Sequence, residues 1–248
     1  MSPIDEALET AREIEENISD FFDTVNDVLD WVPFFLKWAI QPAIDAVNFL
    51  NGKIQEFWAE VKEFLDNTGN PTKLEAHAEA LLNSVANPLG EIAGTIAPEK
   101  LATATEWTGS GAEAYKQLIP SQGKGVSGMK DLSTELANTL KKLANGIENF
   151  WIAMGIAFAS LVVGIIGAIA TAITVVGIPA GVAIIATAIG IAISAIGAAI
   201  LQLKTVYDVI DTSQDTIDQG VTALGEEWAK ATPENQAKID DTKQWEPL

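Results

Sequence analysis

The chain has 248 residues, a net charge of −19, one histidine and no cysteine. Without cysteine it forms neither disulfides nor thiolate metal sites, and a single histidine excludes a multi-histidine site, so we expect no metal and no cofactor. The negative charge repels nucleic-acid phosphates and anionic headgroups, so we expect no nucleic-acid partner. Any membrane contact would have to be hydrophobic.

Residues 1–66 have the pattern of amphipathic helices. Ser2-Pro3, followed by acidic residues, is typical of a helix start. The segment 5–30 carries ten carboxylates against Arg12 alone. A second helix is predicted over about 43–65, where apolar residues recur at helical spacing. The stretch between the two helices forms an apolar patch that contains Trp31, Phe34, Phe35, Leu36, Trp38 and Ile40.

Residues 67–128 are predicted to form a shorter helical hairpin. A loop at 67–71 precedes a helix with a kink near Pro88. The segment 106–111 forms a turn, and a second helix follows it. One proline, three glycines and two serines make 120–128 a predicted loose loop.

Residues 129–230 are predicted to form a long antiparallel helical hairpin. Its far end, 149–203, contains no charged side chain, and Gly and Pro at 177–181 can turn the chain back. Each arm is long enough to cross a bilayer core, which takes about 20 apolar helical residues. With a flexible acidic tail at 231–248, the sequence predicts an all-α protein, an elongated helical bundle whose long hairpin ends in an apolar tip.

The apolar end has two features that suit lipid. The predicted membrane-inserting tip is Val176, Gly177, Ile178, Pro179 and Gly181, which could cross a bilayer without burying a charge. Small residues that recur at every fourth position would let the two arms pack closely, namely Ser160, Gly164, Ala168 and Ala172 in the first arm and Ala186, Gly190, Ser194 and Ala198 in the second. The alternative is a soluble fold in which the N-terminal helices bury the hairpin.

Trp107-Thr108-Gly109 lies between two predicted helices and resembles the Trp-x-Gly family of helical-hairpin proteins exported by type VII (ESX) secretion systems. The similarity covers about 68–117. Downstream, Tyr207 and Asp211 fit the Tyr-x-x-x-Asp export signal of that pathway and lie one helical turn apart. The resemblance implies a four-helix bundle and a composite recognition surface, with Trp107 and Gly109 as one half and Tyr207 and Asp211 as the other.

Two parts of the chain depart from the small members of that family. The helices before Asn67 and the apolar hairpin have no counterpart there, which puts simple chaperone-like pairing in doubt. A long helical pair with an apolar tip is also similar in architecture to α-helical pore-forming toxins.

The sequence contains no catalytic constellation, so we expect the protein not to be an enzyme. His77 stands between Glu75 and Glu79 on a polar helix, which favours an exposed side chain. The stretch 122–125 lacks the glycine spacing and the following Ser/Thr of a phosphate loop. The paired carboxylates lack calcium-loop spacing.

These patterns favour a type VII-secreted protein that inserts its hairpin into a membrane, as an oligomeric pore or a membrane-anchored complex. Its partners would be the secretion machinery, membrane lipid and further copies of itself, and its location the cell envelope or the outside of the cell, in association with a membrane. One alternative is a secreted soluble scaffold or toxin-delivery protein with a buried hairpin. Another is a constitutive membrane protein with two spans.

Overall fold

The computed structural model describes residues 2–33, 40–227 and 230–247, and it divides into two compact units. The first unit comprises Met1–Asn70 and Asn145–Thr205, and the second comprises Pro71–Ala144 and Val206–Leu248. The all-α prediction is confirmed, since helices make up nearly all of the described chain. Of the predicted apolar patch, Phe34, Phe35, Leu36 and Trp38 lie outside the described residues.

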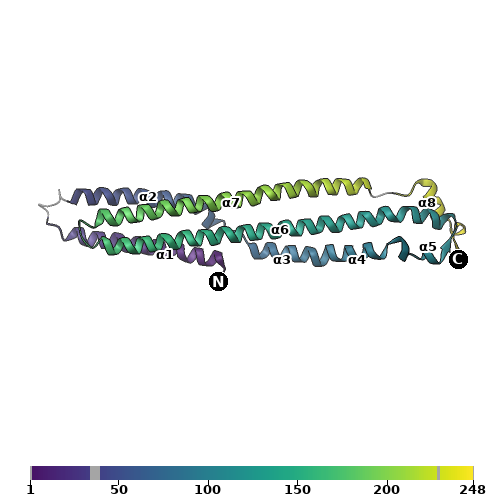
Figure 1. Cartoon of the computed structure of the whole chain (residues 1–248), viewed down its shortest axis with the longest axis horizontal. Helices are drawn as coiled ribbons and strands as arrows, with labels where there is room; N and C mark the ends of the chain where they lie inside the picture. Colours follow the sequence, from purple (N-terminus) through teal and green to yellow (C-terminus); the bar gives the residue numbers. More distant parts are fainter. Residues whose placement is uncertain (1, 34–39, 228–229, 248) are drawn as a thin grey trace. The chain divides into compact units, whose positions relative to one another are not determined.

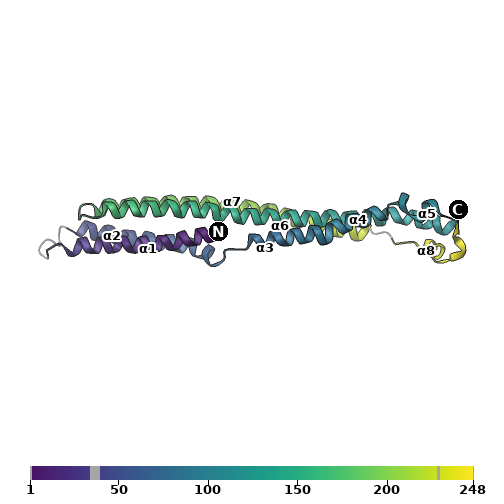
Figure 2. The same cartoon turned by 90° about the horizontal axis from the view of Figure 1, so that it is seen from below.

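The first unit is a helical hairpin packed on a helical hairpin. Its first layer is α1 (Pro3–Asp30) with α2 (Gln41–Asp66), and its second layer combines the end of α6 (Ser110–Thr171) with the start of α7 (Ile178–Glu227). Figures 1 and 2 show these two pairs lying one over the other within this unit. The hairpin of apolar sequence is therefore covered on one side.

Helix α1 separates apolar from acidic residues along its length. At its start the hydroxyl of Ser2 accepts a hydrogen bond from the Asp5 backbone N–H at 3.2 Å, while the Asp5 carboxylate accepts one from the Ser2 hydroxyl at 2.8 Å. That hydroxyl bond holds the pKa of the Asp5 carboxyl below its ordinary value. The buried face of α1 consists of Ala7, Ala11, Ile14, Phe21 and Val25, whereas all ten carboxylates of 5–30 are exposed.

The core of the first unit draws large side chains from both layers. Phe57 of α2 meets Phe158 of α6 edge to face, with ring centroids 5.9 Å apart. Trp151 is 1% exposed, and its indole Nε1 donates a hydrogen bond to the carbonyl of Thr68 at 2.8 Å. The loop after α2 is thus tied to the root of the apolar hairpin.

The second unit contains the shorter elements and the polar parts of the two long helices. In chain order it holds α3 (Pro71–Leu81), a π-helical turn (Leu82–Ala86), α4 (Asn87–Thr95), a 3-10 turn (Pro98–Lys100), α5 (Ala102–Thr105), β1 (Trp107–Thr108), the remaining parts of α6 and α7, α8 (Pro233–Asp240), a second 3-10 turn (Thr242–Gln244) and β2 (Glu246–Pro247). The π-helical turn comes just before Pro88, where a kink was predicted. Strand β1 pairs antiparallel with β2, with Trp107 opposite Pro247.

The predicted loose loop at 120–128 is wrong, because α6 continues through it without interruption. The predicted boundary between 67–128 and 129–230 therefore falls inside a helix. Glycine costs a helix about 1 kcal/mol relative to alanine, but here it permits close packing. A Cβ at Gly128 would lie 2.5 Å from Leu224 Cδ2 of α7, so the glycine lets the two helices approach. Tertiary packing has overridden the local preference for a loop.

The predicted flexible tail at 231–248 is also corrected, because its described residues fold onto the second unit. The Trp245 ring lies 6.2 Å from that of Trp107 and 6.1 Å from that of Tyr115. Its indole Nε1 donates to the carbonyl of Ile239 at 2.9 Å. Aromatic contacts between distant positions, which local composition does not reveal, order this segment.

Candidate membrane-contact face and recognition motifs

Two helices contain stretches long and apolar enough to cross a membrane, one in α6 and one in α7. In the structure only 39% of the most apolar stretch of α6 and 28% of that of α7 is buried. Since α1 and α2 cover one side, most of this apolar surface remains open. A single chain therefore does not bury the whole hairpin in its core.

The apolar arm of α6 carries two apolar rows, each with alternating spacings of three and four residues. Such spacing is the pattern by which one helix packs along another. The buried row is Trp151, Met154, Phe158, Leu161, Ile165, Ala168 and Ala172. The exposed row is Ile152, Ile156, Ala159, Val163, Ile166, Ala170 and Ile173.

The apolar arm of α7 repeats this arrangement. Its buried row is Ile178, Val182, Ile185, Ile189, Ala192, Ile196 and Ala199. Its exposed row is Ala180, Ile184, Thr187, Ile191, Ser194, Ala198 and Leu201. We call the two exposed rows together the outer face. It contains no charged residue, and Val163 at 71% and Leu201 at 67% are among its most exposed side chains.

Of the small residues predicted to pack between the arms, Gly164, Ala168 and Ala172 of α6 do so. A Cβ at Gly164 would lie 2.6 Å from the Ala188 Cβ, and Ala168 is fully buried, so both lie where the helices are close. Ser160 and, in α7, Gly190, Ser194 and Ala198 are exposed.

The prediction of small residues inside and bulky ones outside is therefore wrong for both arms, because bulky side chains make up most of each buried row. The isoleucine row of α7 lies in the core that it shares with α1 and α2. Burying an isoleucine contributes about 1.5–3 kcal/mol, more than burying alanine or glycine.

Three hydroxyl groups within the uncharged run are bonded within their own helix. The hydroxyls of Ser160, Thr171 and Thr187 donate to the carbonyls of Ile156, Gly167 and Ala183, at 2.9, 2.9 and 2.8 Å respectively. In hydrocarbon every polar group needs an internal partner, because water is absent. These side chains would enter a bilayer without leaving a hydrogen bond unmade.

The predicted tip residues lie in the turn between α6 and α7 and in the first turn of α7. Val176 is 88% exposed, whereas Ile178 is fully buried. The Gly177 N–H donates to the Thr174 carbonyl at 2.9 Å, which closes the turn. Pro179 occupies the first turn of α7, a position where proline needs no hydrogen-bond partner.

Both glycines of the tip are required by close packing. A Cβ on Gly177 would collide with the carbonyl oxygen of Thr171. One on Gly181 would lie 2.9 Å from the Ala168 carbonyl and 3.3 Å from the Phe21 ring of α1.

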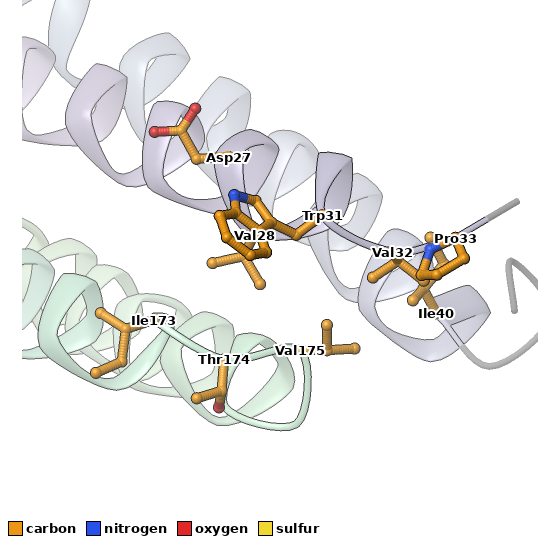
Figure 3. A pocket seen from close by; sticks show the side chains of 9 residues that line it. All are labelled: Asp27, Val28, Trp31, Val32, Pro33, Ile40, Ile173, Thr174 and Val175. Atoms are coloured by element: carbon orange, nitrogen blue, oxygen red, sulfur yellow. The ribbon is translucent and has the colours of Figure 1, made fainter.

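An apolar hollow of about 690 Å³ lies beside the tip (Figure 3). It is lined by Asp27, Val28, Trp31, Val32, Pro33, Ile40, Ile173, Thr174 and Val175. The connection between α1 and α2 therefore lies at the same end of the first unit as the tip. Trp31 is 90% exposed there, which adds an aromatic side chain of the kind found at membrane interfaces.

Trp107 and Gly109, the predicted secretion residues before α6, form a turn that the chain's own C-terminal segment covers. Gly109 has φ +98°, a conformation that favours glycine, and a Cβ there would collide with the Gln244 carbonyl. A Cβ on Gly111 would lie 2.7 Å from Trp245 Nε1. Trp107 remains 37% exposed.

Tyr207 and Asp211 are both exposed on α7, one turn apart, so one partner can contact both. They do not meet Trp107 within one chain. The hydroxyl of Ser213 on α7 donates a hydrogen bond to the carboxylate of Glu135 on α6. Because the two helices are antiparallel, Tyr207, which precedes Ser213, lies beside a part of α6 that is even farther from Ser110 than Glu135 is. More than 25 helical residues separate these positions, about 40 Å at 1.5 Å per residue. A composite surface from both motifs would require two chains.

The remaining candidate residue, His77, is exposed on α3. Among the described residues, no group of three or more His, Asp or Glu is arranged to hold a metal ion. Comparison with protein-family models, curated proteins and solved structures finds no match. The likeness to the Trp-x-Gly family rests on the sequence motifs.

Two features were missed by sequence reasoning, namely the outer face and the C-terminal segment that covers the turn at Trp107 and Gly109 (the C-terminal cover). The outer face was detectable, because the alternating spacing of its rows stands in the sequence. The cover was not, because Trp245 and Trp107 lie 138 positions apart in sequence and no pattern links them.

Proposed function

We propose that this protein is a non-enzymatic, membrane-inserting helical protein whose apolar hairpin enters a bilayer. The observation that carries the proposal is the outer face, two uncharged apolar rows left open along both arms. Soluble proteins rarely leave so large a contiguous apolar surface exposed, and where they do it marks a contact with another molecule or a membrane. Internally bonded hydroxyls and an uncharged tip support entry into hydrocarbon.

Insertion across the bilayer requires α1 and α2 to separate from the hairpin. The ten exposed carboxylates of α1 cannot follow it, since an acidic side chain at the bilayer centre costs about 2.5–3.5 kcal/mol. Lipid, or further copies in an oligomeric pore or membrane-anchored complex, would then cover the seam that α1 and α2 leave. Small residues on the outer face, such as Ser194 and Ala198, would let hairpins of neighbouring copies approach.

The open outer face weighs against the alternative of a soluble scaffold with a buried hairpin. A constitutive two-span protein is less well supported, because α1 and α2 bury a complete apolar row on each arm. Such a cover suits a chain that also exists in water.

The test is dye release from liposomes, with a pair of matched glycine variants. Gly190→Asp places a charge at an exposed position of α7 next to Ile191 of the outer face, and Gly52→Asp places the same charge on α2; both glycines are exposed and have no atom within 4 Å of an added Cβ. We expect release by wild type and Gly52→Asp, and at least a tenfold slower release by Gly190→Asp, since one central charge costs about 2.5–3.5 kcal/mol. No release by wild type at several pH values and lipid compositions would refute the proposal.

We further propose that the protein reaches the envelope by type VII export. Tyr207 and Asp211 support this, because both are exposed on one face of α7 and free to meet a receptor. Tyr207→Ala is expected to leave the protein in the cells of a host with this pathway, whereas Val209→Ala, on the same helix and 44% exposed, should be exported normally. Immunoblots of cells and medium measure this, and equal export of both variants would contradict the signal.

A further inference from the structure

We propose that a second copy of this chain covers the outer face in water, so that the soluble form is a homodimer joined through the exposed rows of α6 and α7. This inference concerns the protein before it meets a membrane, and it does not depend on the proposed function. Three features of the outer face carry it, namely its spacing, its charge and its area.

The spacing of the outer face matches that of a row already packed in this chain. On each arm the exposed row and the buried row have seven members each, at the same alternating intervals. The buried rows pack against α1, α2 and each other, which shows that such rows accept helical partners here. A second copy presents the same spacing in return, as an isologous two-fold interface requires.

The distribution of charge favours self-association through this face alone. Elsewhere the chain carries a net charge of −19, so two copies repel each other over most of their surface. The run from 149 to 203 contributes none of that charge. Two outer faces in contact also direct the acidic α1 of each copy away from the interface, because α1 lies in the other layer of the first unit (Figure 2).

The area of the outer face is sufficient for a stable dimer. From Ile152 to Ile173 the exposed row of α6 runs about 32 Å at 1.5 Å per residue. Two adjacent helices of about 10 Å diameter give about 600 Å² per copy, or about 1,200 Å² in all. Stable protein interfaces begin at about that size, and this one would be uncharged and mostly apolar.

The test is the mass of the detergent-free protein, measured by sedimentation equilibrium over a range of concentrations. Wild type is expected at twice the chain mass of 26.4 kDa. Val163→Glu, at a position 71% exposed on the outer face, should be monomeric, with at least a hundredfold weaker association. Phe49→Glu, at a position 55% exposed on α2, should remain dimeric.

A second variant guards against misfolding of the first. Gly167→Asp places a charge on an exposed position of α6 with no atom within 4 Å of the new Cβ, so the fold of the chain should not change. Helical circular dichroism like that of wild type, together with a monomeric mass, would support the interface. A monomeric wild type, a wild type soluble only with detergent or lipid on this face, or an equal effect of Phe49→Glu would overturn it.

Discussion

A disulfide between positions 7 and 155 is expected to stop dye release from liposomes until it is reduced. A Cβ at Gly155 of α6 would lie 4.0 Å from the Cβ of Ala7 of α1, within the 3.5–4.5 Å range of disulfide Cβ atoms. The natural chain has no cysteine, so the double variant Ala7→Cys, Gly155→Cys can form this one intramolecular bond. The bond would hold α1 against the apolar arm of α6, from which α1 must separate before the hairpin can insert.

The expected effect follows from the charge of α1. A locked α1 would have to bring its carboxylates along with the hairpin, at about 2.5–3.5 kcal/mol for each one that reaches the bilayer centre. We expect release at least tenfold slower for the oxidised protein, with full recovery on addition of a reductant. The single variant Ala7→Cys, which cannot form the bond, controls for the substitution. Equal release by the oxidised and reduced forms would mean that the hairpin enters without parting from α1.

The Trp151→Ala variant is expected to lose more stability than any exposed substitution in the first unit. The side chain is 1% exposed and packs against the Phe150 ring at 5.5 Å between centroids. Its removal leaves a cavity, which costs about 3–5 kcal/mol for a buried tryptophan. The Thr68 carbonyl also loses its hydrogen bond, which adds about 1 kcal/mol.

Urea denaturation followed by circular dichroism measures this loss as a fall in the free energy of unfolding. Trp31→Ala is the matched control, because that tryptophan is 90% exposed and should change the free energy by less than about 0.5 kcal/mol. Trp151→Phe should fall between the two, since it keeps most of the packing and loses the hydrogen bond. Similar losses for Trp31→Ala and Trp151→Ala would show that the core of the first unit does not depend on this side chain.

Local signals predicted the helices of the first unit well. Capping residues and apolar spacing placed the start of α1, and the uncharged run with its Gly-Pro turn placed the paired arms of α6 and α7. They failed at 120–128, where Gly128, a residue type that usually marks a loop, instead makes room for Leu224 of the partner helix. A glycine looks the same in the sequence whether it serves a turn or a close helix contact.

The candidate site was predicted in part. Glycine and proline placed the tip at the turn and the start of α7, and helix geometry placed Tyr207 and Asp211 on one helical face. The predicted packing of Gly190, Ser194 and Ala198 failed, because the partner of α7 is not the other arm alone. Nothing near these residues in sequence indicates that α1 will pack on α7, where the Phe21 ring lies beside Gly181.

The sequence by itself determined that the protein is helical and that it carries a long uncharged hairpin. Both properties are local, since propensity, spacing and the absence of charge act residue by residue. Only the tertiary structure decided which side of each arm is covered and which is open. Both sides of each arm are apolar, so the choice depends on the shapes of the side chains that α1 and α2 bring from the other end of the chain.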